Sequence, residues 1–517
     1  MFPSVDVCFC LNKFGCGEYM SWIDDAVIYQ VNLRSLAARE PRNAIEAVAE
    51  VEPELSPLEY LTANLEKISE LGVNLIYLVP PYPIGVEGRK GIGSPYSSRD
   101  FMAVESEYGT LDNVKELIRR THELGLRIIF DITPNHTSRD HVWTQSKPDY
   151  YVHRDDGSLF YDFDWSDVAK LNYRNPDLRR AMIDVFDFWL SVLGQDEQGH
   201  FCGIDGFRLD MAHMLNDLSF WNEAMVELSG RHSSRELLFL AESYGTPRNL
   251  DLFERGVNAA YDDDFYKLCQ YLYAVDGAGA TLIDESPEAA YNGDFSDKLR
   301  AFRAGGIAAA ALCCITNYAD KFAAGAGPRV ARYSDNHDEG RGLHRFGAGA
   351  VMAVNRLLFM SPNCIPFILT GQEFGALNRP SIHERFNICD KGPRVVCNGE
   401  TSVQPGIEFE GNLFARSRAE RQHWYEFYRE LIMLRSSTPA LRYGDFAVLN
   451  VGEDAADAEK SVVAFERSYN GKSVRCAVNL GGAERVLGNA GLFSGEVLYG
   501  GLRDGRIEAF GSVVVAV

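Results

Sequence analysis

Short apolar segments alternate along this chain with amphipathic helical segments, and this alternation limits the fold more than any other feature. Strands that are apolar almost throughout are typical of parallel sheets, because helices cover both of their faces. The strand-like segments are residues 26–31, 73–79, 126–131, 203–210, 237–242, 257–262, 329–334 and 366–370. Eight strand–helix units predict an α/β fold with a (β/α)8 TIM barrel. A doubly wound open sheet fits less well, because no Gly-rich phosphate loop follows the first strand.

Local signals mark where the first helices begin and end. Ser56 and Glu59 have the spacing of a capping box, and Pro57 stands at the first helical position. Gly72 stands where that helix should end, and Thr110 where the next should begin. These residues predict helices that follow the first and second strands.

Three regions depart from the strand–helix alternation. Residues 137–174 separate the third strand from its helix and are rich in Tyr, Trp and Asp, which predicts an inserted lid subdomain. Residues 376–416 form a second irregular stretch after the eighth strand. From residue 441, short strands alternate with Gly and Asn turns. We therefore expect a barrel made of residues 1–136 and 175–440, followed by an antiparallel β-domain at 441–517.

Composition and charge argue against several classes of partner. The 73 acidic and 51 basic residues give a net charge of −22, which would repel a phosphate backbone and disfavours nucleic acid. The 11 cysteines are scattered without CxxC spacing, as in reduced cytoplasmic proteins. No basic residue precedes Lys13 and no apolar run approaches a membrane span, so neither a signal peptide nor a membrane segment is expected. The predicted location is cytoplasmic, and the oligomeric state is left open.

Ionisable side chains stand at the C-terminal ends of four predicted strands. In a (β/α)8 barrel these ends meet on one rim, where active sites lie. Each residue alone has an ordinary structural explanation, such as an ion pair or a hydrogen-bonded core histidine. Four such sites on one rim together predict an active site. They are Asp131 with Asn135 and His136, Arg208 with Asp210, Glu242, and Asn336 with His337 and Asp338.

The types of these residues indicate glycoside hydrolysis. A retaining glycosidase needs one ionised and one protonated carboxyl group across the scissile bond. Arg208 points the same way as Asp210 on a strand and would hold it ionised, as a nucleophile requires. Glu242 follows the apolar run 239–241, which would raise its pKa and suit it to be the general acid. Asp338 would stabilise positive charge on the sugar ring.

These residues lie in segments that resemble the four signature sequences of the α-amylase family of glycoside hydrolases. The segments are Asp131–His136, Gly206–Asp210, Phe239–Glu242 and Asn336–Asp338. A fifth segment, Gly93–Tyr96, is similar to the one whose tyrosine stacks under the sugar at the cleavage point. The resemblance covers residues 22–440 in the family's order. It implies a barrel with a subdomain inserted after the third strand and a C-terminal antiparallel β-sandwich.

The resemblance also implies a role for each residue. The implied catalytic residues are Asp210 as nucleophile, Glu242 as acid/base and Asp338 as stabiliser of the transition state. The residues implied around the attacked sugar are Tyr96, His136, Arg208 and His337. No cofactor is implied to be required.

Lys170 departs from the pattern of many family members, which carry aspartate at this place in the segment Val168–Asn172. In those members the aspartate is similar in role to a calcium ligand, alongside an asparagine that matches Asn135. A lysine ammonium cannot ligate calcium, so Lys170 argues against a structural calcium ion. Lysine here instead resembles the neopullulanase and cyclomaltodextrinase branch. That branch usually has an extra N-terminal domain, whereas about twenty residues precede the barrel here.

The expected function is a retaining α-glucan hydrolase that cleaves α-1,4 bonds of starch, glycogen or maltooligosaccharides. A transglycosylase of the glucanotransferase or maltosyltransferase type would use the same three carboxylates, so it stays open, as does a neopullulanase-like enzyme. A metal-dependent hydrolase is disfavoured by the order of the motifs. A non-catalytic relative, such as the heavy subunits of some amino-acid transporters, is disfavoured because all three carboxylates are retained.

The aromatic residues of the predicted lid have two explanations. They would stack on sugar rings beyond the central one, or they would form the core of the lid itself. The sequence leaves this open for Trp143, Tyr150, Tyr151, Tyr161 and Trp165.

Overall fold

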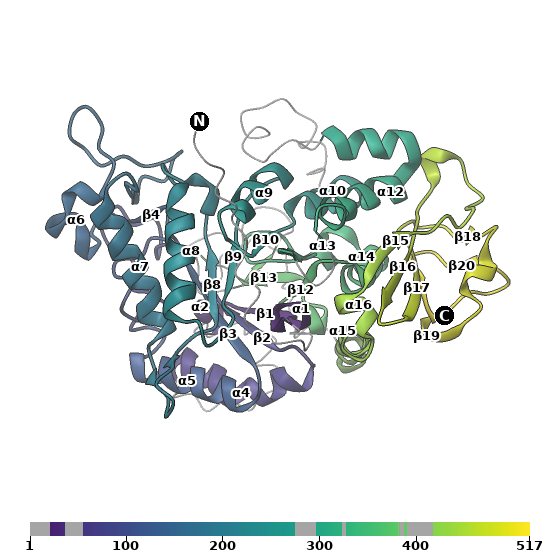
Figure 1. The fold of residues 1–517 in the computed structure, drawn as a ribbon, viewed down its shortest axis with the longest axis horizontal. Coiled ribbons are helices and arrows are strands. Elements are labelled where there is room, and N and C mark those ends of the chain that lie inside the picture. Colours follow the sequence, from purple (N-terminus) through teal and green to yellow (C-terminus); the bar gives the residue numbers. More distant parts are fainter. Residues whose placement is uncertain are drawn as a thin grey trace, which may run out of the picture.

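Eight parallel strands close into a barrel in the computed structural model, which describes residues 21–36, 55–274, 296–322, 327–380, 382, 387–389 and 417–517 (Figure 1). Around the barrel the order is β1-β12-β11-β10-β9-β8-β3-β2. The strands are β1 (Ile28–Val31), β2 (Leu75–Leu78), β3 (Arg127–Ile132), β8 (Gly206–Leu209), β9 (Leu238–Ala241), β10 (Ala259–Tyr261), β11 (Arg329–Arg332) and β12 (Cys364–Leu369). Each lies within or overlaps a predicted strand, and the predicted fold class is confirmed.

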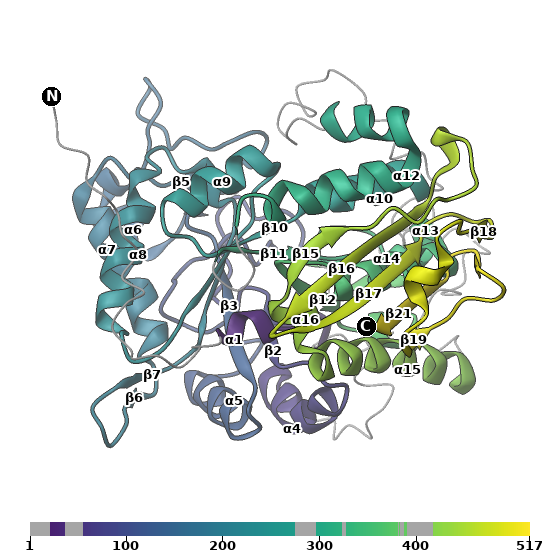
Figure 2. The same ribbon diagram turned by 45° about the vertical axis from the view of Figure 1, so that its right-hand side comes forward.

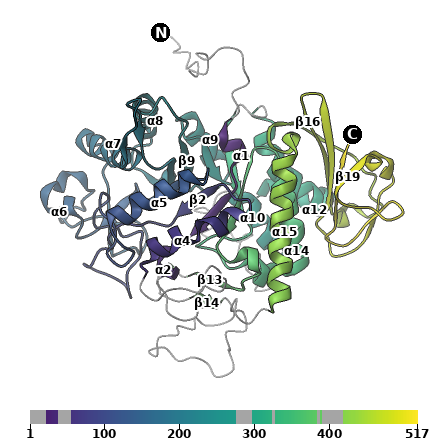
Figure 3. The same ribbon diagram turned by 90° about the horizontal axis from the view of Figure 1, so that it is seen from below.

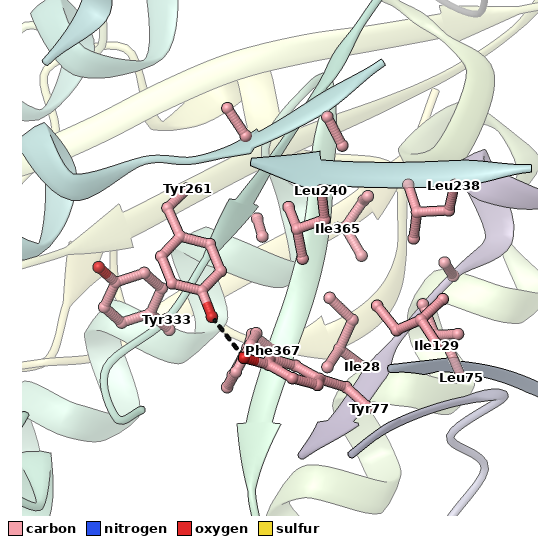
Figure 4. Packing of buried hydrophobic residues seen from close by; sticks show 14 of the residues in the cluster. Ile28, Leu75, Tyr77, Ile129, Leu238, Leu240, Tyr261, Tyr333, Ile365 and Phe367 are labelled. Carbon is pink, nitrogen blue, oxygen red and sulfur yellow. Dashed lines mark hydrogen bonds between the residues drawn. The ribbon is translucent and has the colours of Figure 1, made fainter. Parts of the chain in front are cut away.

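The interior of the barrel changes from apolar to polar along its axis. Alternate residues of each strand point inward, and the first inward residues are aliphatic, among them Ile28, Leu75, Ile129 and Leu238 (Figure 4). Tyrosines form a later layer, which contains Tyr77, Tyr261 and Tyr333 (Figure 4). The hydroxyls of Tyr77 and Tyr261 are 3.5 Å apart. This layer joins the packed core to the charged groups at the C-terminal ends of the strands.

Helices surround the barrel (Figures 1 and 2). The longer ones are α4 (Pro57–Glu70), α5 (Leu111–Glu123), α7 (Pro176–Leu190), α8 (Ser219–Arg231), α9 (Thr246–Glu254), α10 (Asp263–Tyr273), α12 (Ser296–Ala319), α14 (Ala348–Met360) and α15 (Arg418–Ser437). Shorter helices are α1 (Trp22–Asp25), α2 (Leu33–Leu36), α13 (Gly342–Phe346) and α16 (Pro439–Tyr443). The capping box of Ser56 and Glu59 is confirmed, and Thr110 caps α5.

The helix α12 is interrupted near its middle. Its backbone leaves helical geometry at Gly305 and Gly306, and Gly306 has φ +72°. A Cβ at Gly306 would lie 2.6 Å from the carbonyl oxygen of Lys460, so the close approach of the C-terminal domain requires glycine there. By length and composition α12 is the one helix in the described ranges that is long and apolar enough to cross a membrane. It nevertheless packs against α10 and the C-terminal domain.

A small subdomain lies between β3 and α7. It contains β4 (His136–Ser138), α6 (Val142–Ser146) and β5 (Val168–Lys170). β4 and β5 pair antiparallel, with His136 opposite Lys170. A hairpin of β6 (Gly194–Gln195) and β7 (Phe201–Cys202) follows α7. The predicted stretch 376–416 lies mostly outside the described residues, apart from the paired β13 (Asn378–Pro380) and β14 (Asn387–Cys389) and a few neighbours.

The C-terminal domain is an antiparallel sheet with a different apolar cluster on each face. The sheet has the order β15-β16-β17-β21-β19. Val463 and Phe465 belong to the cluster shared with the barrel, whereas Val462 and Ala464 belong to a separate cluster with Ile507. Seen from below, α15 lies between the barrel and this sheet (Figure 3). The strands are β15 (Asp445–Val448), β16 (Val462–Tyr469), β17 (Lys472–Asn479), β19 (Glu496–Gly500) and β21 (Ser512–Ala516), with β18 (Arg485–Val486) and β20 (Arg506–Ile507) as a second small sheet.

Candidate active site

Arg208 stands among three carboxylates at the C-terminal ends of the strands. Its Nη1 donates to both oxygens of Asp131, at 2.9 and 3.0 Å, and to Oδ1 of Asp210 at 2.8 Å. Its Nη2 forms an ion pair with Oε2 of Glu242 at 2.8 Å. The guanidinium is fully buried. One buried cation therefore faces three carboxyl groups.

Strand register explains why these side chains meet. Arg208 on β8 lies opposite Asp131 on β3 and opposite Leu240 on β9. Asp210 and Glu242 follow Arg208 and Leu240 by two residues, so all four side chains point into the barrel. The expectation that alternation brings Arg208 and Asp210 together is confirmed.

The pKa values of Asp210 and Glu242 shift in directions opposite to those expected from sequence. The two buried carboxyl groups affect each other's pKa. Burial raises the pKa of Glu242, but the charge of Arg208 and two further hydrogen bonds outweigh burial and lower that pKa to about 2. The donors are the Tyr244 hydroxyl, 2.7 Å from Oε1, and the Met211 N–H, 3.1 Å from Oε2. Burial and the Glu242 carboxylate raise the pKa of Asp210 well above its ordinary value.

Asp131 connects the carboxylates to two tyrosines. Its Oδ2 accepts from the hydroxyl of Tyr77 at 2.6 Å and from that of Tyr96 at 2.8 Å. Burial raises the pKa of Asp131 to about 6, although Arg208 and both hydroxyls act in the opposite direction. Tyr77 was not expected at the site, because a tyrosine inside an apolar run is usually a core residue.

His337 and Asp338 follow β11, on the side of the rim where Tyr96 lies. The ring of Tyr96 stacks on His337 at 5.6 Å between centroids and 17° between planes. Nδ1 of His337 is 2.7 Å from Nε2 of Gln30, which donates, so Nε2 of His337 carries the ring proton. That Nε2 lies 3.0 Å from Oδ2 of Asp338, whose side chain is 42% exposed. Asp338 is therefore the solvent-facing carboxylate of the site, and Gln30 is a second residue that was not expected there.

His136 begins β4, where the barrel meets the inserted subdomain. Burial lowers its pKa to about 4, so the imidazole is neutral at neutral pH. Its Nδ1 is 3.3 Å from Nδ2 of Asn135, and its ring lies 5.4 Å from that of Trp165. A neutral imidazole is suited to exchange hydrogen bonds with sugar hydroxyls.

Lys170 lies where the resemblance would place a calcium ligand. Its Nζ is 2.8 and 2.9 Å from the two oxygens of Asp162, and Nδ2 of Asn135 donates to the same carboxylate at 2.9 Å. The side chains of Lys170 and Asp162 are 12% and 14% exposed. An ammonium and an amide N–H already meet this carboxylate, and neither is a calcium ligand. This group of residues does not fit a calcium ion.

The far side of Glu242 is lined by residues that were not expected from sequence. The ring of Tyr244 meets His213 edge-on at 5.6 Å and lies 5.7 Å from Nζ of Lys267. Lys267 is paired with Asp263 at 2.5 Å. None of these residues stands at the end of an apolar run, so no sequence pattern indicates that they belong to the site. Only the three-dimensional fold brings them there.

A groove between α15 and β19 lies apart from these carboxylates. Its lining includes Met433, Val497, Leu498 and Tyr499, and it contains none of the expected site residues. The candidate site is therefore assigned from the charged cluster on the rim.

A closed parallel barrel with a subdomain after the third strand and carboxylates on the C-terminal rim defines the class of (β/α)8-barrel enzymes. The family model described as "Alpha amylase, catalytic domain" matches residues 54–236. This match and the relatives described next support the α-amylase family for this chain.

Individual relatives include both hydrolases and transferases. "Alpha-amylase MalA" of Haloarcula japonica is 28% identical over 368 residues, 69% of this chain and 45% of that protein. "Alpha-1,4-glucan:maltose-1-phosphate maltosyltransferase" of Bifidobacterium longum is 28% identical over 208 residues, 36% of this chain and 26% of that protein. The matches thus span less than half the length of these two relatives. The alpha-amylase from Lactobacillus plantarum, whose crystal structure is known, is 25% identical to this chain in sequence. The two structures superpose with a TM-score of 0.65 over 96% of this chain and 99% of that one.

Proposed function

We propose that this protein is a retaining α-glucan hydrolase that cleaves α-1,4 bonds of starch, glycogen or maltooligosaccharides through a covalent glycosyl-enzyme intermediate. The observation that carries the proposal is the contact of the buried Arg208 with both Asp210 and Glu242 on the barrel rim, each at 2.8 Å. Two buried carboxyl groups beside one cation favour a state in which one is protonated and one ionised, which is the state that a retaining reaction starts from.

The reaction begins when a sugar ring separates Asp210 from Glu242. A proton is then needed on Glu242, next to the leaving oxygen. Arg208 contacts both carboxylates and so compensates for a negative charge on either one. Asp210 attacks the anomeric carbon as Glu242 protonates the leaving oxygen, and Glu242 later takes a proton from the water that releases the sugar. Asp338 faces the positive charge that develops on the ring.

We also propose that the enzyme needs no calcium ion and no other cofactor. The contact of Lys170 with Asp162 supports this, because the ammonium supplies the positive charge that a metal would otherwise bring. A metal-dependent reaction at the rim is disfavoured for a similar reason, since the buried Arg208 would repel a cation among the same carboxylates. Six cysteines in the described part of the chain are free thiols, in keeping with the proposed cytoplasmic location.

Transglycosylation is the second candidate function. The maltosyltransferase relative supports it, as does "Trehalose synthase/amylase TreS" of Mycobacterium tuberculosis, which is 32% identical over 37% of this chain and 33% of that protein. Both reactions share the glycosyl-enzyme intermediate and differ in the acceptor.

Chromatography of the products formed from maltoheptaose over time distinguishes these functions. Only shorter oligosaccharides are expected for the hydrolase. Products both longer and shorter than the substrate would establish transfer instead. Failure to convert maltoheptaose, pullulan and cyclodextrins would contradict both candidates, with the Asp210→Asn variant as the control for contaminating activity.

A further inference from the structure

Most aromatic side chains of the inserted subdomain pack within the protein. Trp143 packs against Phe101, His141 and Tyr150, with centroid distances of 5.8, 4.6 and 5.5 Å. Tyr151 is buried, and its hydroxyl lies 3.0 Å from that of Thr137. These rings therefore form the core of the subdomain and are not free to stack on sugar rings.

Tyr161 also has a structural partner. The guanidinium of Arg154 lies 4.3 Å from the centre of its ring. A cation at that distance covers the ring face that a sugar would need. Tyr161 is therefore set aside as a binding surface.

Trp165 and Phe163 form a pair of a different kind. Their rings are 5.0 Å apart, and the side chain of Phe163 is 57% exposed. Phe163 has φ +50°, a backbone conformation that a bulky residue rarely adopts. Glycine or asparagine would fit that backbone better and would leave less apolar surface in water. The ring of Phe163 is thus held on the surface at a cost to stability.

The pair lies directly beside the candidate active site. Trp165 is 5.4 Å from the ring of His136, and Phe163 lies on Trp165. A continuous ring surface therefore leads outward from the central sugar position. A substrate chain that leaves this position along His136 meets Trp165 first and Phe163 next.

The loop that carries the two rings is fixed from both sides. Asp162 is held by Lys170 and Asn135. On the other side, Nζ of Lys90 donates to the carbonyl oxygen of Asp164 at 2.8 Å. A surface fixed before binding loses little conformational entropy when a ligand arrives.

The charges around the rings indicate the class of ligand. Asp162, Asp164 and Asp167 flank them, and Asp164 is exposed. Carboxylates repel anions and disfavour an apolar protein partner, but they accept hydrogen bonds from hydroxyl groups. A neutral ring with an apolar face and a hydroxyl edge fits both parts of this surface.

We propose that Trp165 and Phe163 form a stacking platform for a glucosyl unit of the substrate chain, adjacent to the unit bound between Tyr96 and His136. This rests on the proposed function, because it takes an α-glucan as the ligand. Its effect is to favour chains that are long enough to reach the platform over short ones.

Phe163→Gly is the decisive variant, because glycine accepts the φ of +50° while the ring is lost. Binding of maltoheptaose is measured by calorimetry in the full-length Glu242→Gln background, so that the result does not depend on turnover. We expect the Kd to rise about fivefold to thirtyfold in Phe163→Gly, because the apolar ring face that the bound sugar would cover is lost. The melting temperature of Phe163→Gly should equal or exceed that of the parent protein. Phe163→Trp, which keeps an aromatic ring at this position, should bind with the Kd of the parent protein.

Phe201→Ala is the matched control, because Phe201 is a 40% exposed phenylalanine on the β6–β7 hairpin. It should leave the Kd unchanged. An unchanged Kd in Phe163→Gly, or no binding of maltoheptaose to Glu242→Gln at all, would overturn the platform. Failure of the proposed function would look different, because the wild-type protein would then bind maltoheptaose without cleaving it.

Discussion

The hydroxyl of Tyr244 donates a hydrogen bond to Oε1 of Glu242 at 2.7 Å. The two residues are separated by one residue in the loop after β9, so the loop carries both the carboxylate and a donor for it. This contact favours the ionised form of Glu242, in addition to the larger effect of the Arg208 charge. The pKa of Glu242 therefore depends in part on a hydroxyl group that no apolar run in the sequence reveals.

Tyr244→Phe removes this donor and should raise the pKa of Glu242. The second proton then binds to the carboxyl pair at a higher pH, so the acidic limb of the kcat/KM profile should move up by about one pH unit. The profile is measured with maltoheptaose from the lowest pH at which the protein stays folded up to pH 9, because the acidic limb set by Glu242 lies at low pH. Tyr161→Phe is the control, since Tyr161 lies on the surface of the subdomain. An acidic limb that stays in place would show that Tyr244 does not set the protonation of the pair.

Asp210→Asn should separate activity from stability. Turnover should fall roughly a thousandfold or more, because the nucleophile is lost. Burial and Glu242 raise the pKa of Asp210, so this carboxyl group lowers stability at pH 8, where it is ionised in the unfolded chain; a neutral amide has no such cost, and unfolding should cost about 1 kcal/mol more. Denaturant titration measures this difference. Near wild-type turnover would remove Asp210 as the nucleophile.

Lys170→Ala should leave Asp162 as a mostly buried, unpaired charge. The free energy of unfolding should then fall by about 3 kcal/mol, and Asp162→Ala in the same chain should recover part of the loss.

Dialysis of the wild-type protein against EDTA should change neither its melting temperature nor its activity. A fall in either that calcium reverses would contradict the proposed absence of a metal.

His141 should make stability depend on pH below neutrality. Burial lowers its pKa to about 3, whereas an unfolded histidine titrates near 6.5. The unfolded state therefore binds more protons between these values, and stability falls as the pH falls through this window. His141→Asn keeps an acceptor for the N–H of Trp143 and removes the titration, so its stability should fall less between pH 7 and pH 5. Equal slopes for the two proteins would contradict the assignment.

The barrel was predictable because its strands are buried on both faces and so are mostly apolar. The pairing of Arg208 with Asp210 was predictable because alternation along a strand is local. The start of β8 shows the limit of such patterns. The apolar stretch begins at Gly203, but Asp205 turns to His122 and Arg127 at 2.8 and 3.0 Å, and the strand begins only at Gly206.

The contacts from other elements were not predictable in the same way. Gln30 and Tyr77 have the inward positions of core residues, and only closure of the barrel brings them to His337 and Asp131. The lowered pKa of Glu242 depends on Arg208 and also on the Tyr244 hydroxyl and the N–H of Met211, whose directions follow from loop geometry. Residue types thus indicated the chemistry, while the fold set the charge state.

The anomeric configuration of the first product tests the central claim most directly. Proton NMR of a fresh digest of maltoheptaose distinguishes the α- from the β-anomer at the new reducing end before the two interconvert. Double displacement through Asp210 predicts the α-anomer, which is the configuration of the bond that was cleaved. The β-anomer as first product would mean single displacement by water, and would contradict the assignment of Asp210 as nucleophile and Glu242 as acid/base.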